Sequence, residues 1–223
     1  YNVSTEAERK GIDFYIDVDP EIPDILYGDD TRISQIFQYI LFYAVSNTES
    51  GRVMMDVCFR KNQGANSVTL MVRISDTGEG LSKEDLDSIF TSYETYDSRR
   101  DSRLKKFGLE LTICRGLLEK MKGKLQLDSI AEVGSSVSFS FDCFVVENTP
   151  LTDVSNIRAW NMLIFCSGEY IRKRWESLVG EFRGMADYAD NCADFEAALN
   201  KGNYSCIFLP QERYEELKDH ISE

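Results

Sequence analysis

Apolar and polar positions along the first two thirds of the chain alternate in some segments and recur every three or four residues in others. The predicted strands are 14–18, 52–61, 67–75, 124–128 and 136–144, and the predicted helices are 32–48, 83–90 and 109–121. A short polar segment with Gly64 joins two of these strands and predicts a hairpin. The mixture predicts an α/β domain over residues 1–146.

From residue 161 onward, short apolar strands and amphipathic helices alternate. The predicted strands are 161–165, 185–188 and 206–209, and the predicted helices are 170–179, 194–199 and 213–221. Strands that alternate with helices are typical of a parallel sheet. Residues 147–155 contain Pro150 and are the predicted linker, so residues 156–223 form a second, small α/β domain.

The polar and charged segment Thr91–Lys106 interrupts the first pattern, and we expect a mobile loop there. Its centre, Ser98–Arg103, carries three arginines. Arg103, Lys105 and Lys106 could serve as counter-charges to a phosphate, but a charge run in a polar loop is more often a solvated surface.

Composition excludes several classes of protein. The net charge is −13 and no basic patch is evident, so we expect no binding to nucleic acid. No apolar run reaches the length of a membrane span, so we expect no membrane contact by this chain. The six cysteines are scattered without a metal or disulfide spacing, which indicates buried free thiols in a reducing cytosol.

The most specific local motif is Asp76-Thr77-Gly78-Glu79-Gly80. It follows a predicted strand and precedes a predicted helix. An aspartate at a strand end with spaced glycines can read a purine and let phosphates approach the backbone. The alternative is an aspartate that opens a tight glycine turn.

The order of motifs from residue 11 to about 146 resembles the ATP-binding domain of sensor histidine kinases, the ATPase family shared with gyrase and Hsp90. The matching segments are Gly11–Phe14, Pro20–Pro23, Tyr27–Ile36, Asp76–Gly80, Ser88–Tyr93 and Gly134–Phe139. The resemblance implies a two-layer α/β sandwich of the histidine-kinase ATPase type. It also implies a nucleotide site with Asp76 on the adenine amino group and Gly78, Gly80 and Gly108 around it.

Several residues depart from the family pattern. The first long helix should carry two asparagines and then a lysine, which help hold Mg²⁺ and phosphates, but Tyr39, Tyr43 and Ser46 stand there. A neutral phenol is bulky and a poor ligand for Mg²⁺, which prefers small oxygen donors. In the second glycine box, Glu110 replaces a glycine and adds a carboxylate close to the expected phosphates.

The segment after the linker resembles the first half of a response-regulator receiver. A working receiver needs acidic residues after its first strand and a phosphoacceptor aspartate after its third, and Cys166, Ser167 and Pro210 occupy these positions. No phosphoacceptor histidine helix is present. His220, the only histidine, lies in a charged C-terminal segment, and we expect it to face solvent.

The resemblance therefore implies a cytoplasmic part of a hybrid sensor-kinase-like protein in a two-component phosphorelay, acting as a pseudokinase or scaffold. We expect ATP or ADP to bind at low affinity at most, without Mg²⁺. The chain opens at Tyr1 within a pattern, so we expect a longer parent, homodimeric and anchored in the inner (plasma) membrane. Its partners would be kinase, receiver or phosphotransfer domains of the phosphorelay.

Two alternatives stay open. One is an active histidine kinase that uses modified metal and phosphate contacts. The other is a protein-docking module whose groove is filled by Tyr39, Tyr43 and Phe107.

Overall fold

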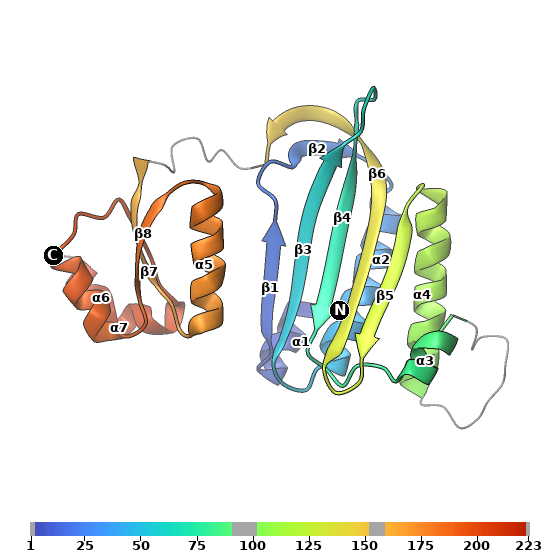
Figure 1. Cartoon of the computed structure of the whole chain (residues 1–223), viewed down its shortest axis with the longest axis horizontal. Coiled ribbons are helices and arrows are strands. Elements are labelled where there is room, and N and C mark those ends of the chain that lie inside the picture. The colour runs from blue at the N-terminus through green and yellow to red at the C-terminus, as the bar shows by residue number, and fades with distance from the viewer. Residues whose placement is uncertain (1–2, 91–101, 152–158, 222–223) are drawn as a thin grey trace. The chain divides into compact units, whose positions relative to one another are not determined.

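The computed structural model describes residues 3–90, 102–151 and 159–221, which belong to two compact units, Tyr1–Thr152 and Asp153–Glu223 (Figure 1). The side chains of residues 102–105, 181, 219 and 220 are outside this description. Each unit has its own sheet and its own core.

The first unit is built on a six-stranded mixed sheet. Its elements are α1 (Val3–Lys10), β1 (Asp13–Val18), β2 (Pro23–Tyr27), α2 (Asp30–Asn47), β3 (Arg52–Lys61), β4 (Ser67–Asp76), α3 (Lys83–Ser88), α4 (Ser102–Lys120), β5 (Lys124–Ile130) and β6 (Gly134–Pro150). The strand order is β1-β3-β4-β6-β2, with β5 paired to the first half of β6 and β2 to the second. Only the β1–β3 pair is parallel among these described strands.

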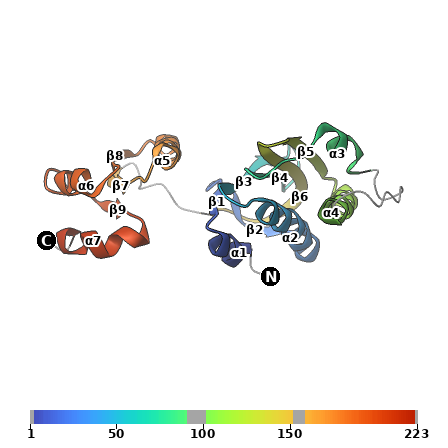
Figure 2. The same cartoon turned by 90° about the horizontal axis from the view of Figure 1, so that it is seen from below.

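Helices α1, α2 and α4 lie on one face of this sheet (Figure 2). Alternate residues of the strands point to that face, since side chains along a strand alternate between the two faces. The core is therefore formed by Ile36, Ile40 and Leu111 of the helices against Val53, Val72, Ile74 and Phe139 of the strands. Burial of this apolar surface holds α2 against β4 and holds α4 against α2, β5 and β6.

Local sequence signals explain where α2 begins and ends. The side chain of Asp29 accepts a hydrogen bond from the backbone N–H of Arg32 at 3.0 Å, which caps the first turn. At the other end, the backbone of Thr48 is extended, and its hydroxyl donates to the carbonyl of Ala44 at 2.8 Å. The carboxyl end of α2 is thus held by a fully buried threonine rather than by a glycine cap.

Four features differ from the sequence-based expectation. Helix α1 and strand β2 were not predicted. Helix α4 begins at Ser102, so residues 102–106 are helical and not part of a loop, while residues 91–101 lie outside the described residues. Strand β6 continues to Pro150 and pairs with β2, so the first four residues of the predicted linker belong to the sheet.

The second unit has the predicted parallel sheet. Its elements are β7 (Asn161–Phe165), α5 (Glu169–Glu181), β8 (Met185–Ala189), α6 (Cys192–Leu199), β9 (Cys206–Phe208) and α7 (Gln211–Ile221), with strand order β8-β7-β9. Val179 of α5 packs on one face of the sheet, and Phe195 and Leu217 of α6 and α7 pack on the other. The central strand β7 is therefore buried on both faces, as its continuous apolar run requires.

All six thiols are free, as predicted from their spacing. Cys114, Cys143 and Cys166 are buried, and burial raises the pKa of all three thiols. The prediction of burial is wrong for Cys58, which is exposed on β3, a strand whose alternate side chains face away from the helices. Among the described residues, no helix is long and apolar enough to cross a lipid bilayer.

Candidate functional site

Asp76 is the last residue of β4 and is one of few buried polar side chains in the described core. Its Oδ1 accepts hydrogen bonds from the backbone N–H of Gly78 at 2.9 Å and of Ser135 at 3.4 Å. Burial raises the pKa of Asp76 to about 6, against the opposing effect of these two amide bonds. One carboxylate oxygen is thus held by the backbone, and the group is poised to accept a further hydrogen bond.

The two glycines of the motif are required by close contacts between backbone segments. Gly80 has φ +65°, and a Cβ atom at that position would collide with the carbonyl of Ile130. A Cβ atom on Gly78 would collide with the carbonyl of Asn47 at the end of α2. The turn after Asp76 can therefore fit between α2 and the β5–β6 connection only with glycine at both places.

Two serines that sequence reasoning missed complete this turn. The hydroxyl of Ser129 accepts the backbone N–H of Leu81 at 2.8 Å and lies 2.9 Å from the hydroxyl of Ser135. Ser135 is buried, and its own N–H reaches Asp76. Ser135 lies in the Gly134–Phe139 segment, but no role was assigned to either serine, because their bonds to Leu81 and Asp76 join segments 48 and 59 positions apart.

At the α2 positions where the family pattern carries its Mg²⁺-binding residues, Tyr43 packs against an aromatic ring. The ring of Tyr43 is stacked on the ring of Phe107 from α4, with centroids 3.2 Å apart and an interplanar angle of 6°. Both side chains are buried, and the Tyr43 hydroxyl accepts an N–H from the side chain of Asn47 at 3.2 Å. Tyr39 is half-buried, and its hydroxyl accepts an N–H from Gln35 at 3.0 Å.

The second glycine box lies in the first turns of α4. A Cβ atom on Gly108 would lie only 2.7 Å from the carbonyl of Ile89, so this glycine allows α4 to approach the end of α3. The Glu110 side chain is only 12% exposed and lies 3.7 Å from the ammonium of Lys106. Burial raises the pKa of Glu110, and Lys106 acts to lower it.

Lysines near the site have partners other than a ligand. The ammonium of Lys106 also lies 4.9 Å from the centre of the Phe42 ring. Arg103 and Lys105 belong to α4, but their side chains are outside the described residues. Ser46, at the position of the family's lysine, is half-buried, and its backbone carbonyl accepts a hydrogen bond from Lys10 at 3.0 Å.

The second unit shows what stands at the receiver positions. Cys166 follows β7 and is fully buried, and Pro210 lies just after β9. The nearest charged groups form an exposed cluster in which Arg172 contacts Asp190 at 2.6 Å and Glu176 at 3.2 Å. His220 lies in α7, but its side chain is outside the described residues.

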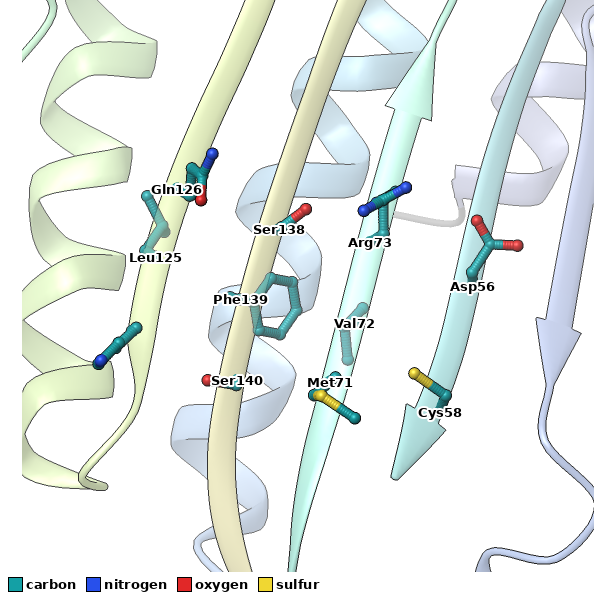
Figure 3. Close-up of a pocket in the computed structure, with 11 residues that line it drawn as sticks. Asp56, Cys58, Met71, Val72, Arg73, Leu125, Gln126, Ser138, Phe139 and Ser140 are labelled. Carbon is teal, nitrogen blue, oxygen red and sulfur yellow. The ribbon is translucent and has the colours of Figure 1, made fainter. Parts of the chain in front are cut away.

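A shallow hollow lies on the sheet of the first unit, on the face away from the helices (Figure 3). Arg73, Ser138 and Gln126 point into it from three neighbouring strands, with Asp56 and Cys58 on the next strand. Exposed polar residues on one face are normal for an antiparallel sheet. The hollow is separate from the Asp76 turn, because the turn contacts the end of α2 on the opposite side of the sheet.

The geometry thus brings together only part of the predicted set. Asp76, Gly78 and Gly80 form one turn that could accept the amino group of a purine. At the other end, the pair of rings closes the space between α2 and α4, and Glu110 adds an acidic group. Among the described residues, this arrangement offers an acceptor for a base, and tyrosines stand at the α2 positions where small oxygen donors for Mg²⁺ were expected.

Comparison with known families gives an independent result. The family described as "Histidine kinase-, DNA gyrase B-, and HSP90-like ATPase" matches residues 28–144. This range includes every residue predicted for the nucleotide site. It also excludes the second unit from the match.

Similar proteins include "Hybrid signal transduction histidine kinase B" of Dictyostelium discoideum, 31% identical over 147 residues, which cover 66% of this chain and 7% of that protein. "Autoinducer 2 sensor kinase/phosphatase LuxQ" of Vibrio vulnificus is 32% identical over 136 residues, covering 60% of this chain and 16% of that protein. The chain thus spans only a small part of the length of these relatives.

Among solved structures, full-length ShkA in complex with AMPPNP matches with a TM-score of 0.66 at 18% identity. The match covers 99% of this chain and 48% of that one. At this identity the likeness concerns the fold, and it confirms the predicted combination of a histidine-kinase ATPase sandwich and a small parallel α/β unit.

Proposed function

Since the chain belongs to the histidine kinase-, DNA gyrase B- and HSP90-like ATPase family, we propose that its first unit is the ATP-binding domain of a hybrid sensor-kinase-like protein in two-component signalling. Within that protein it acts as a pseudokinase, with weak binding of ATP or ADP and no productive Mg²⁺ complex. The relatives named as hybrid signal transduction kinases support the signalling context.

Weak nucleotide binding is supported by the Asp76 turn. Its carboxylate is fixed by two backbone amides, and the glycines around it keep the backbone close. A buried acceptor of this kind suits the exocyclic amino group of adenine, because an unpaired donor in a buried site is costly. This end of the site fits the base of a nucleotide.

Impaired catalysis is supported by the stack of Tyr43 on Phe107, the observation that carries the proposal. Phosphoryl transfer depends on a metal ion and on positive or N–H groups that neutralise developing charge. Two buried aromatic rings provide neither, and the nearby Glu110 carboxylate would repel a phosphate. The residues present therefore do not fit a Mg²⁺–triphosphate group, and we propose no phosphoryl transfer by this unit.

The second unit supports a scaffold role. With buried Cys166 and Pro210 at the receiver positions, it offers no aspartate for phosphorylation there. We assign it to contact with other phosphorelay proteins, such as kinase, receiver or phosphotransfer domains. The cytoplasm is the corresponding site of action, with the longer parent homodimeric and anchored in the inner membrane.

Calorimetric titration of the whole chain tests the proposal. We expect ADP and ATP to bind with dissociation constants above about 100 µM, that is, with less than about 5.5 kcal/mol of binding free energy. Added Mg²⁺ should leave both affinities unchanged. Submicromolar, Mg²⁺-dependent ATP binding with transfer of phosphate would instead establish an active kinase.

Matched variants separate the two ends of the site. Asp76→Asn should abolish the remaining nucleotide binding, whereas Asp128→Asn on the exposed side of β5 should leave it unchanged. Replacing both Tyr39 and Tyr43 by Asn should strengthen ATP binding and make it sensitive to Mg²⁺. Absence of nucleotide binding in wild type and all variants would favour the docking module over the pseudokinase.

A further inference from the structure

Lys10, the last residue of α1, reaches across to the carboxyl end of α2. Its ammonium donates to the backbone carbonyls of Val45, Ser46 and Thr48, each at 3.0 Å. The Lys10 side chain is only 14% exposed. All three N–H donors of the ammonium are therefore matched to carbonyls of one helix end.

These bonds complete the hydrogen bonding of the α2 terminus. The last four carbonyls of a helix have no partner within the helix and must find one elsewhere. Here the Thr48 hydroxyl takes the carbonyl of Ala44, and Lys10 takes those of Val45 and Ser46. A positive charge at this place also complements the helix dipole.

The remaining carbonyl, that of Asn47, contacts the Asp76 turn. It lies so close to Gly78 that no Cβ atom would fit between them. Arg52, which begins β3 after the end of α2, is also bound to this turn. The Thr77 N–H donates to the Arg52 carbonyl at 3.1 Å, and the Arg52 N–H donates to the Thr77 hydroxyl at 3.0 Å. The end of α2 is thus one wall of the turn that holds Asp76.

We propose that Lys10 is a positioning residue that couples the placement of α1 to the geometry of the Asp76 turn. When α1 is docked, the Lys10 ammonium fixes the end of α2, and the Asn47 carbonyl supports Gly78. When α1 moves away, three carbonyls lose their donor together, and the support of the turn is released. The regulatory meaning of this coupling, control of base binding by the segment that carries α1, rests on the proposed function.

The small buried surface of α1 makes the docking of this helix depend on a few contacts. The helix has eight residues, and Ala7 is its only fully buried residue in the described core. A short helix with little buried apolar surface has low stability by itself, so its attachment depends strongly on individual contacts. Beside the apolar contacts of Val3 and Ala7, Lys10 supplies the hydrogen bonds that link α1 to the end of α2, and its ammonium also lies 3.8 Å from the Glu49 carboxylate.

Hydrogen exchange of the whole chain, read by mass spectrometry, tests the coupling. Lys10→Met keeps the apolar stem of the side chain and removes the donors. We expect exchange in residues 44–51 and 77–81 to become about tenfold faster or more, with strands β3 and β4 unchanged, as for local opening. Lys10→Arg should restore part of the protection, and Lys61→Met, which removes an exposed lysine at the end of β3, should have no effect.

Two outcomes would overturn the proposal. Faster exchange confined to residues 44–51 would make Lys10 an ordinary helix cap, and uniform acceleration in all strands would indicate global destabilisation. ADP affinity provides a second measurement, and we expect Lys10→Met to weaken it. If wild type binds no ADP, the proposed nucleotide function fails, while the exchange pattern still decides the role of Lys10.

Discussion

The aromatic rings of Tyr43 and Phe107 lie almost parallel, with 3.2 Å between their centroids, and they join the last turns of α2 to the first half of α4. The contact brings together residues that are 64 positions apart in the sequence. Both side chains are nearly without solvent contact. The pair therefore contributes to the stability of the first unit, and under the proposed function it also fills the expected phosphate region.

Replacing Phe107 by Ala should strongly destabilise the first unit. The change removes a fully buried ring and leaves a cavity against Tyr43, which typically costs about 3–5 kcal/mol. Urea denaturation followed by far-ultraviolet circular dichroism measures the loss, because both tryptophans, Trp160 and Trp175, belong to the second unit. Phe144→Ala is the control, since that ring is 64% exposed and its removal should cost less than about 1 kcal/mol. Equal losses in the two variants would contradict the buried stack.

Asp76→Asn should stabilise the protein at neutral pH. The pKa of Asp76 is about 6 in the fold and near 3.8 in the unfolded chain, so the folded state binds its proton more tightly. Stability is therefore highest below the unfolded pKa, falls as pH rises from about 4 to 6, and stays lower above. Above pH 6 the ionised carboxylate lowers the free energy of unfolding by at most about 3 kcal/mol. This figure takes about 1.4 kcal/mol for each tenfold change in proton affinity.

Unfolding of Asp76→Asn and wild type should be compared at several pH values. The gain from the substitution should be present at pH 7 and should vanish below about pH 4. A variant that is less stable than wild type at pH 7 would show that the carboxylate stabilises the turn through its charge.

Two glycine substitutions should have opposite effects. Gly80→Ala places a side chain at φ +65° against the carbonyl of Ile130, and we expect a loss of about 1–3 kcal/mol. Gly116→Ala lies on the exposed side of α4 with open space around it, and it should stabilise by about 0.5–1 kcal/mol because alanine is the better helix former. Thermal unfolding of the two single variants checks both signs.

The second unit should not accept a phosphoryl group at the receiver position. Incubation of the whole chain with acetyl phosphate, followed by intact-mass measurement and peptide mapping, should give no aspartyl phosphate in residues 153–223. The physical reason is that proline has no side-chain oxygen and the Cys166 thiol is buried. An adduct on Asp190, whose carboxylate contacts Arg172, would overturn the prediction.

Much of the fold follows from local patterns. The apolar spacing of α2 predicts that helix to within two residues of its start and one of its end, whereas its N-cap, Asp29, was identified only from the structure. The parallel unit follows from the regular alternation of strands and helices. The Asp76 turn was also predictable, because its aspartate and both glycines lie in one stretch of five residues.

The missed elements have physical reasons. Helix α1 has only two apolar residues, Val3 and Ala7, so its packing against the core leaves little periodic signal in the sequence. Pro23 reads as a break, yet it begins an edge strand, where its missing N–H needs no partner. The Tyr43–Phe107 stack and the Lys10 bonds join distant segments, and only the folded chain brings them together.

The pairing of β6 with β2 also determines how the first unit responds to tension on the chain that follows it. The outermost contacts are the hydrogen bond from the Leu151 N–H to the Ile22 carbonyl and the rung between Pro150 and Pro23, two residues without an N–H. A pull at Leu151 would load these contacts one after another, as in peeling, rather than all at once. Each residue of β6 peeled from β2 would free about 3.3 Å of chain. The end of β6 is therefore a short stretch of sheet that can be released under load residue by residue.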